Sequence, residues 1–150
     1  MKKKFDFKYN KKKDGWKLIR SADFNQNPPT FKEFLKNNED CVDGKELMAR
    51  AKKLGAPAGQ LHAEHMLLNG SIPSELEKFA LLFLGTIWEH PDGYKCIPAL
   101  RIGQICEIEE LAGFGIPVID GFHNCGWIID FVRLDKKLLN PARIAISQSS

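Results

Sequence analysis

The period of the apolar positions divides the chain into three parts. Near the N-terminus, aromatic and polar residues alternate over residues 4–9. After a turn at 11–15 that ends in Gly15, Trp16, Leu18 and Arg20 alternate with Lys17 and Ile19. A period of two is typical of a strand with one buried face. We therefore expect residues 4–9 and 16–20 to form a β-hairpin.

The middle of the chain carries the signals of four helices. Capping boxes, in which one side chain caps the first turn and a Glu three residues later reaches back, mark helix starts. The three pairs with this spacing are Thr30 and Glu33, Asp43 and Glu46, and Ser74 and Glu77. The predicted helices cover about 30–35, 44–54, 58–68 and 75–89. The last is predicted to be the central helix, because residues 79–88 are almost all apolar.

The last third of the chain has the pattern of strands. Strands are predicted over 95–102, 105–110, 117–122 and 127–132, with a final one over 142–146. Residues 127–132 are nearly all apolar, which indicates burial on both faces. Strands followed by helices and then strands again favour an α+β fold. We expect a single domain over residues 1–150, with an N-terminal β-hairpin, a four-helix middle segment and a C-terminal antiparallel sheet of about four strands.

Composition excludes several classes of protein. Hydrophobic residues make up 43% and charged residues 27%, which is ordinary for a globular chain. The start of the chain has no apolar signal core, and the apolar run at 79–88 is about half of a membrane span. The four cysteines form no C-x-x-C pair, which favours reduced, buried thiols. We therefore expect a cytoplasmic protein without a membrane segment, a bound metal or a cofactor.

Charge is concentrated at the N-terminus. Residues 1–13 hold seven lysines and one aspartate, a net charge of +6, whereas the whole chain has +3. Such lysines beside aromatic residues can contact phosphates and bases, dock on an acidic protein, or protect an edge strand from aggregation. The candidate binding residues, for nucleic acid or for a partner, are Lys4, Lys8, Lys11, Lys12, Lys13 and Trp16.

Two clusters suggest catalysis or metal binding. Asp120, His123 and Cys125, with Asp130 beyond them, could supply a cysteine nucleophile and its base. However, His123 and Cys125 are two residues apart in a turn, whereas catalytic pairs usually meet across separate elements. A structural turn is therefore favoured over a catalytic site.

The second cluster lies in the third predicted helix. His62 and His65 are one turn apart and could share a metal ion. Residues 62–64 match the H-x-E that opens the zinc-deaminase signature, but no P-C-x-x-C completes it. His65 also shares a helix face with two leucines, which is typical of a histidine at the edge of a core. We therefore predict no metal site here.

No complete catalytic signature, phosphate-binding loop or nucleic-acid-recognition motif is present. The sequence favours a small binding or regulatory protein over an enzyme, acting on a protein partner in the manner of an inhibitor or accessory factor of a mobile element. One alternative is a nucleic-acid-binding protein that uses the lysine-rich hairpin. Another is a hydrolase or metal enzyme, which would require one pocket to contain His62, Glu64, Asp120, His123, Cys125 and Asp130.

Overall fold

The computed structural model describes residues 7–25, 27–36, 39, 41–70, 72–102, 126–135, 138–139 and 142–148. The elements are, in chain order, the 3₁₀ helix η1 (Lys11–Asp14), β1 (Lys17–Ser21), β2 (Thr30–Lys32), β3 (Cys41–Val42), α1 (Gly44–Leu54), α2 (Gln60–Asn69), the 3₁₀ helix η2 (Ser74–Leu76), β4 (Ala80–Leu82), β5 (Thr86–Glu89), β6 (Lys95–Ile102), β7 (Trp127–Arg133), β8 (Leu138–Leu139) and β9 (Ala142–Ile146).

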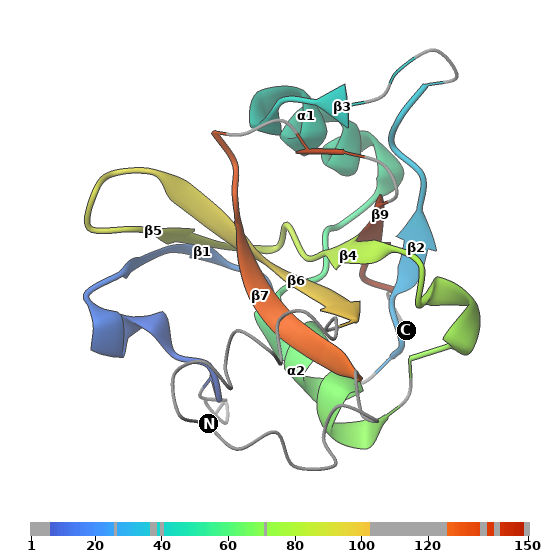
Figure 1. The fold of residues 1–150 in the computed structure, drawn as a ribbon, viewed down its shortest axis with the longest axis horizontal. Coiled ribbons are helices and arrows are strands. Elements are labelled where there is room, and N and C mark those ends of the chain that lie inside the picture. Colours follow the sequence, from blue (N-terminus) through green and yellow to red (C-terminus); the bar gives the residue numbers. More distant parts are fainter. Residues whose placement is uncertain are drawn as a thin grey trace, which may run out of the picture.

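Seven strands form one mixed sheet in the order β1-β5-β6-β4-β9-β2, with β7 also paired to β6 (Figure 1). The centre of this sheet is β6, because its start pairs with β5, Leu100 and Ala99 pair with β4, and residues 96–102 pair with β7. These pairs are antiparallel, whereas β4 and β9 run parallel. The short strands β3 and β8 form a separate two-stranded sheet. The long strand β6 therefore connects the part of the main sheet formed by β1 and β5 to the part formed by β4, β9 and β2.

Both faces of the sheet are buried at its centre, because α1 and α2 lie on opposite sides of it (Figure 1). Leu82 and Leu84 belong to the core cluster that includes residues of α1, and Leu81 and Phe83 belong to the cluster that includes residues of α2. Successive residues of an extended chain point to opposite faces. Four consecutive apolar residues therefore fill two separate cores.

The predicted helix over 75–89 is wrong. Its first residues form η2, and the rest form β4 and β5. A strand buried on both faces is as continuously apolar as a buried helix, so the period could not separate the two. Gly85, which lies between β4 and β5, is the feature of the sequence that could have indicated a break in the predicted helix. A Cβ at this position would overlap the backbone of Pro57 and the side chain of Ala22, so the link requires a glycine there.

The predicted helix over 30–35 is also wrong. Residues Thr30–Lys32 form β2, which pairs antiparallel with β9. Glu33 does not complete a capping box; its carboxylate accepts a hydrogen bond from Arg143 at 3.1 Å. Pairing with a strand more than a hundred residues away overrides the local capping signal.

The N-terminal β-hairpin is not formed by the described residues. Strand β1 pairs with β5, and residues 7–9 belong to no strand. Residues 4–6 lie outside the described residues. The intervening turn is η1, in which Asn10 caps the backbone N–H of Lys12 and Gly15 ends the helix with a φ of 84°.

Several predicted elements are confirmed. α1 begins after Asp43, whose carboxylate accepts the backbone N–H of Glu46 at 2.8 Å, and it ends before Gly55. α2 ends at Gly70, which has a φ of 60°. Strands β6, β7 and β9 lie where the alternation placed them. The predicted strands over 105–110 and 117–122 lie outside the described residues.

The predicted architecture as a whole is therefore wrong. The described residues contain two α-helices instead of a four-helix middle segment, and a mixed sheet of seven strands instead of an antiparallel one of about four. β7 is also half-buried along most of its length instead of buried on both faces. No helix in the described part of the chain is long and apolar enough to cross a membrane.

Candidate functional site

The two histidines of α2 have different surroundings. His62 is 2% exposed, and its Nδ1 accepts the backbone N–H of Gly59 at 3.3 Å. Burial lowers the pKa of His62, because the imidazolium would lose its hydration. His65 is partly exposed and contacts the side-chain amide of Asn69. Both rings pack against Phe24, with centroids 5.1 and 5.4 Å away, so their shared role in this structure is packing.

The structure does not bring further metal ligands to these histidines. Among the described residues, no three His, Cys, Asp or Glu side chains are placed to hold a metal ion. The Nε2 atom of His62 is buried and has no hydrogen-bond partner in the described part of the chain.

Glu64, the third residue of the H-x-E match, holds the N-terminal segment. Its carboxylate oxygens accept the backbone N–H groups of Lys8 and Tyr9, both at 2.9 Å. The buried Gln60 donates from Nε2 to the carbonyl of Tyr9 at 2.7 Å and accepts the indole N–H of Trp88 at 2.7 Å. This stretch belongs to no strand, so these side chains satisfy backbone groups that a sheet would otherwise satisfy. They fix the chain where it enters η1.

A groove of about 810 Å³ lies between α2, β7 and this N-terminal segment. Its walls are mainly apolar and include the side chains of Leu68 (78% exposed) and Ile128 (36% exposed). Glu64 also lines the groove, but three donors already bind its carboxylate. These hydrogen bonds give the carboxylate a structural role, because they hold the N-terminal segment on α2.

The predicted catalytic cluster is only partly covered by the structure. Asp120, His123 and Cys125 lie outside the described residues. Asp130 lies on β7 with 47% of its side chain exposed, and its carboxylate is 3.1 Å from Nε of Arg101. Because this carboxylate is half-exposed and paired with Arg101, we assign Asp130 a structural role.

Cys96, on β6, is a free buried thiol, as the sequence predicted for the cysteines. Burial raises the pKa of Cys96 to about 11. The thiol is therefore protonated at neutral pH and is a poor nucleophile.

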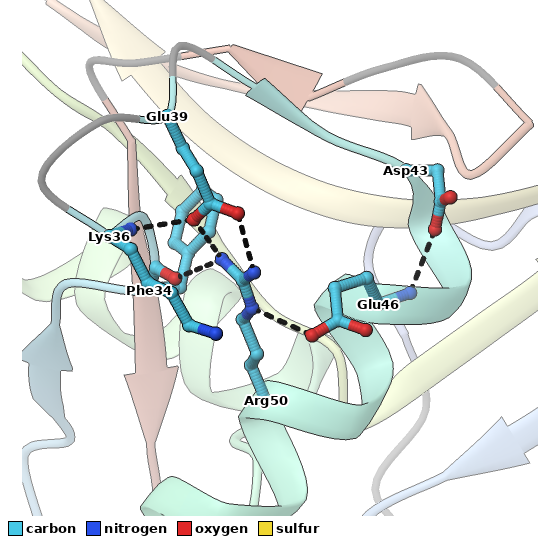
Figure 2. A network of polar contacts seen from close by, with 6 residues as sticks. All are labelled: Phe34, Lys36, Glu39, Asp43, Glu46 and Arg50. Atoms are coloured by element: carbon cyan, nitrogen blue, oxygen red, sulfur yellow. Dashed lines mark hydrogen bonds and ion pairs between the residues drawn. The ribbon is translucent and has the colours of Figure 1, made fainter.

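A network around Arg50 ties α1 to the segment before β3, as Figure 2 shows. The guanidinium binds both carboxylate oxygens of Glu39 at 2.7 and 2.8 Å, the carbonyl of Phe34 at 2.7 Å and Glu46 at 2.9 Å. Glu39 also accepts the backbone N–H of Lys36 at 2.7 Å. The hydrogen bond from Arg50 is the main cause that lowers the pKa of Glu39 to about 2. Every polar atom of this pair has a structural partner, so we assign it to stability.

Replacing Glu39 by Gln is expected to lower the melting temperature most at neutral pH and progressively less as the pH falls below about 4.5. The pKa of Glu39 is about 2 when folded, against an ordinary 4.5. Its contribution is therefore complete above about pH 5 and is lost as pH falls through the range from about 4.5 to about 2. Thermal melts followed by circular dichroism, from about pH 6 to about pH 2.5, measure this difference.

The matched control for this variant is Glu77→Gln, because Glu77 is exposed and has no ion-pair partner among the described residues. Its melting temperature should follow that of the wild type at every pH. A Glu39→Gln deficit that stays constant down to pH 2.5 would show that the carboxylate charge does not stabilise the fold.

Four aromatic rings and two cations form a continuous feature of side chains from η1, the residue before β1, the β5–β6 turn and β7. All six side chains belong to half-buried residues. We name this feature the aromatic surface; its members are Lys11, Trp16, His90, Tyr94, Phe131 and Arg133.

Trp16 is held at the centre of the aromatic surface. Its ring meets those of His90 and Phe131 edge-on, with centroids 4.9 and 5.9 Å apart. The ammonium of Lys11 lies 4.6 Å from the centroid of Trp16 and 5.1 Å from that of Phe131. Each such cation–π contact contributes about 0.5–1 kcal/mol at an exposed site. Together these contacts restrict the rotamers of Trp16 before any partner arrives.

Tyr94 is covered on both ring faces. His90 stacks on it with centroids 4.3 Å apart and planes at 11°, and the guanidinium carbon of Arg133 lies 3.7 Å from its centroid. Two groups this close cannot share one face, so they cover opposite faces. Asp135 binds the guanidinium through Nε at 2.8 Å and Nη2 at 2.6 Å. The edge and hydroxyl of Tyr94 are therefore the parts that can meet a partner.

Strand register explains why these rings meet. Lys17 pairs with Glu89, and Glu89 pairs with Lys95. At the next position along these strands, Trp16 therefore lies beside His90, and His90 lies beside Tyr94. Sequence reasoning identified Trp16 but missed the other rings, because the register of pairing between distant strands is not visible in the sequence. The one local signal was that His90 and Tyr94 flank the same turn.

The candidate lysines fall into two groups. Lys11, Lys12 and Lys13 are the first three residues of η1, which ends at Asp14 shortly before Trp16. Lys12 and Lys13 are exposed, and no carboxylate of the described residues is within ion-pair distance of either. Lys8 lies at the groove instead, with its ammonium 5.7 Å from the ring of Tyr9. Lys4 lies outside the described residues.

Comparison with protein-family models, curated proteins and solved structures finds no match to this chain. The functional argument therefore rests on the geometry of the site.

Proposed function

We propose that this chain is a protein-binding module that docks an acidic surface of a protein partner on its aromatic surface and on the neighbouring lysines of η1. The observation that carries the proposal is the continuous set of half-buried contacts through Trp16, Tyr94 and Arg133. These three residue types dominate the energetic hot spots of protein interfaces.

The geometry of the rings lowers the cost of binding. Immobilising a long side chain at an interface costs about 0.5–1.5 kcal/mol. Here Lys11 holds Trp16, and Asp135 and Tyr94 hold Arg133, before binding occurs. Less entropy is therefore lost when a partner covers them.

The surrounding charge favours an acidic partner. Lys12 and Lys13 are exposed on η1, and Lys17 and Lys95 are exposed at the ends of the neighbouring strands. None of the four has an ion-pair partner among the described residues. Such lysines attract an acidic surface and increase the rate of association.

Nucleic acid is the weaker alternative for the same surface. The two cations on the rings already face carboxylates: Lys11 is 3.3 Å from Asp14, and Arg133 binds Asp135. Phosphate contacts supply most of the affinity for nucleic acid, and these two cations are already paired, whereas a protein partner can also bind through the apolar edges of the rings. Base stacking also needs an open ring face, and both faces of Tyr94 are covered.

Charge reversal on η1 tests the proposal. The tagged wild-type chain and the double variant Lys12→Glu/Lys13→Glu are used to capture partners from native cell extract, with nuclease added. We expect the wild type to retain a protein partner after nuclease treatment. The double variant should retain about tenfold less of it, because like charges then face each other across the interface.

The matched control is Lys52→Glu/Lys53→Glu, which makes the same charge change on exposed residues at the end of α1. This control should capture as much partner as the wild type. Equal loss of captured partner in both double variants would show that capture depends on net charge alone, and this would contradict the proposed surface. Loss of all capture on nuclease treatment would contradict it in favour of nucleic acid.

A further inference from the structure

A cavity of about 730 Å³, which is open to solvent on one side, adjoins the aromatic surface, with which it shares Tyr94 and Arg133. It lies between the first turn of α1, the β5–β6 turn and the end of β7. Its inner wall is apolar, with Met48, Ile87 and Leu134. Clefts that bind ligands usually have about 300–1,000 Å³, so the cavity has room for a large side chain and its adjoining backbone.

The walls of this cavity are fixed by the fold. Gly44, the first residue of α1, approaches the carbonyl of Leu134 so closely that a Cβ at position 44 would collide with it. On the other side, the backbone N–H of Leu134 donates to the carbonyl of Lys95 at 2.8 Å. The segment after β7 is thus held against both α1 and β6, and the cavity exists before a partner binds.

Positive charges outnumber negative charges at the cavity. Arg133 and Asp135 neutralise each other through their paired hydrogen bonds. Lys45 and Lys95 are exposed at the cavity and have no ion-pair partner among the described residues, and Asp92 is the remaining carboxylate that lines it. A group that enters this cavity therefore meets an apolar interior and a net positive surround.

We propose that this cavity receives an apolar side chain flanked by carboxylates, presented by the acidic partner that docks on the aromatic surface. The inference rests on the proposed function, since it names the recognition element of the same partner. An apolar anchor in a preformed pocket, next to a Trp, Tyr and Arg surface, has the composition of an interface hot spot. The flanking carboxylates pair with Lys45 and Lys95.

A peptide titration tests this proposal. The probes are acetyl-Glu-Asp-Phe-Asp-Glu-amide and the same peptide with Ala in place of Phe, added to the ¹⁵N-labelled full chain. With the Phe peptide we expect saturable shifts of the backbone amides of Lys45, Lys95 and Leu134. The Ala peptide should bind about tenfold more weakly, because it lacks the group that fills the apolar interior.

Two variants of α1 complete the experiment. Lys45→Glu should weaken binding of the Phe peptide about fivefold or more, and Lys52→Glu, on an exposed position at the far end of the same helix, should change it less than about twofold. Equal binding of both peptides, or equal effects of the two variants, would overturn the cavity proposal while leaving the aromatic surface in place. Absence of shifts at both the cavity and η1 with either peptide would overturn the cavity proposal and the proposed function together.

Discussion

Leu81→Ala and Leu82→Ala, at adjacent positions of β4, should each lower the free energy of unfolding by about 2–5 kcal/mol. Leu81 is 0% and Leu82 2% exposed, and they belong to the core clusters on opposite faces of the sheet. Each truncation removes three buried carbon atoms and leaves a cavity in a different core. Urea unfolding followed by circular dichroism measures both losses.

The matched control is Leu68→Ala, the same chemical change at a side chain that is 78% exposed. It should change the free energy of unfolding by no more than about 0.5 kcal/mol. A low cost at one of the two β4 positions would mean that one face of the strand is solvent-exposed. That result would contradict the sheet with a helix on each face.

Gln60→Leu should be the other strongly destabilising change, with a loss of about 2–5 kcal/mol. Leucine fills a similar volume but cannot accept the indole N–H of Trp88 or donate to the carbonyl of Tyr9. Each buried polar group left without a partner costs about 1–3 kcal/mol. Chemical denaturation measures the loss, and the fluorescence of Trp88 should shift as its hydrogen bond is removed.

Asn69→Leu is the control for this variant, because it also removes an amide from α2 but at an exposed position, where the amide contacts His65. It should leave the free energy of unfolding within about 0.5 kcal/mol of the wild type. If Gln60→Leu were equally mild, the hydrogen bonds of Gln60 to Trp88 and to Tyr9 would not contribute to stability. The hydrogen bonds from Lys8 and Tyr9 to Glu64 would then be left to hold the segment before η1 on α2.

The candidate site was only partly visible in the sequence. Lys11, Lys12, Lys13 and Trp16 were selected from their charge and aromatic character, and the structure places them together. Phe131 and Arg133 join them through the pairing of β7 with β6. Nothing local to residue 16 indicates that contact, because pairing across more than a hundred residues depends on how the whole sheet assembles. Residues 62–64 show the opposite case: a motif-like spacing whose side chains serve packing and hydrogen bonding to the backbone.

The sequence by itself determined the elements whose signals are local. α1 was predictable because Asp43 caps the N–H of Glu46 within four residues, and Gly55 ends the helix. The tertiary structure decided the region 75–89 and the partner of β1. An apolar run such as 79–88 specifies burial, but helix and strand can bury it equally well. The choice was made by the parallel pairing of β4 with β9 and by the close approach of Gly85 to Pro57, contacts that only the assembled chain provides.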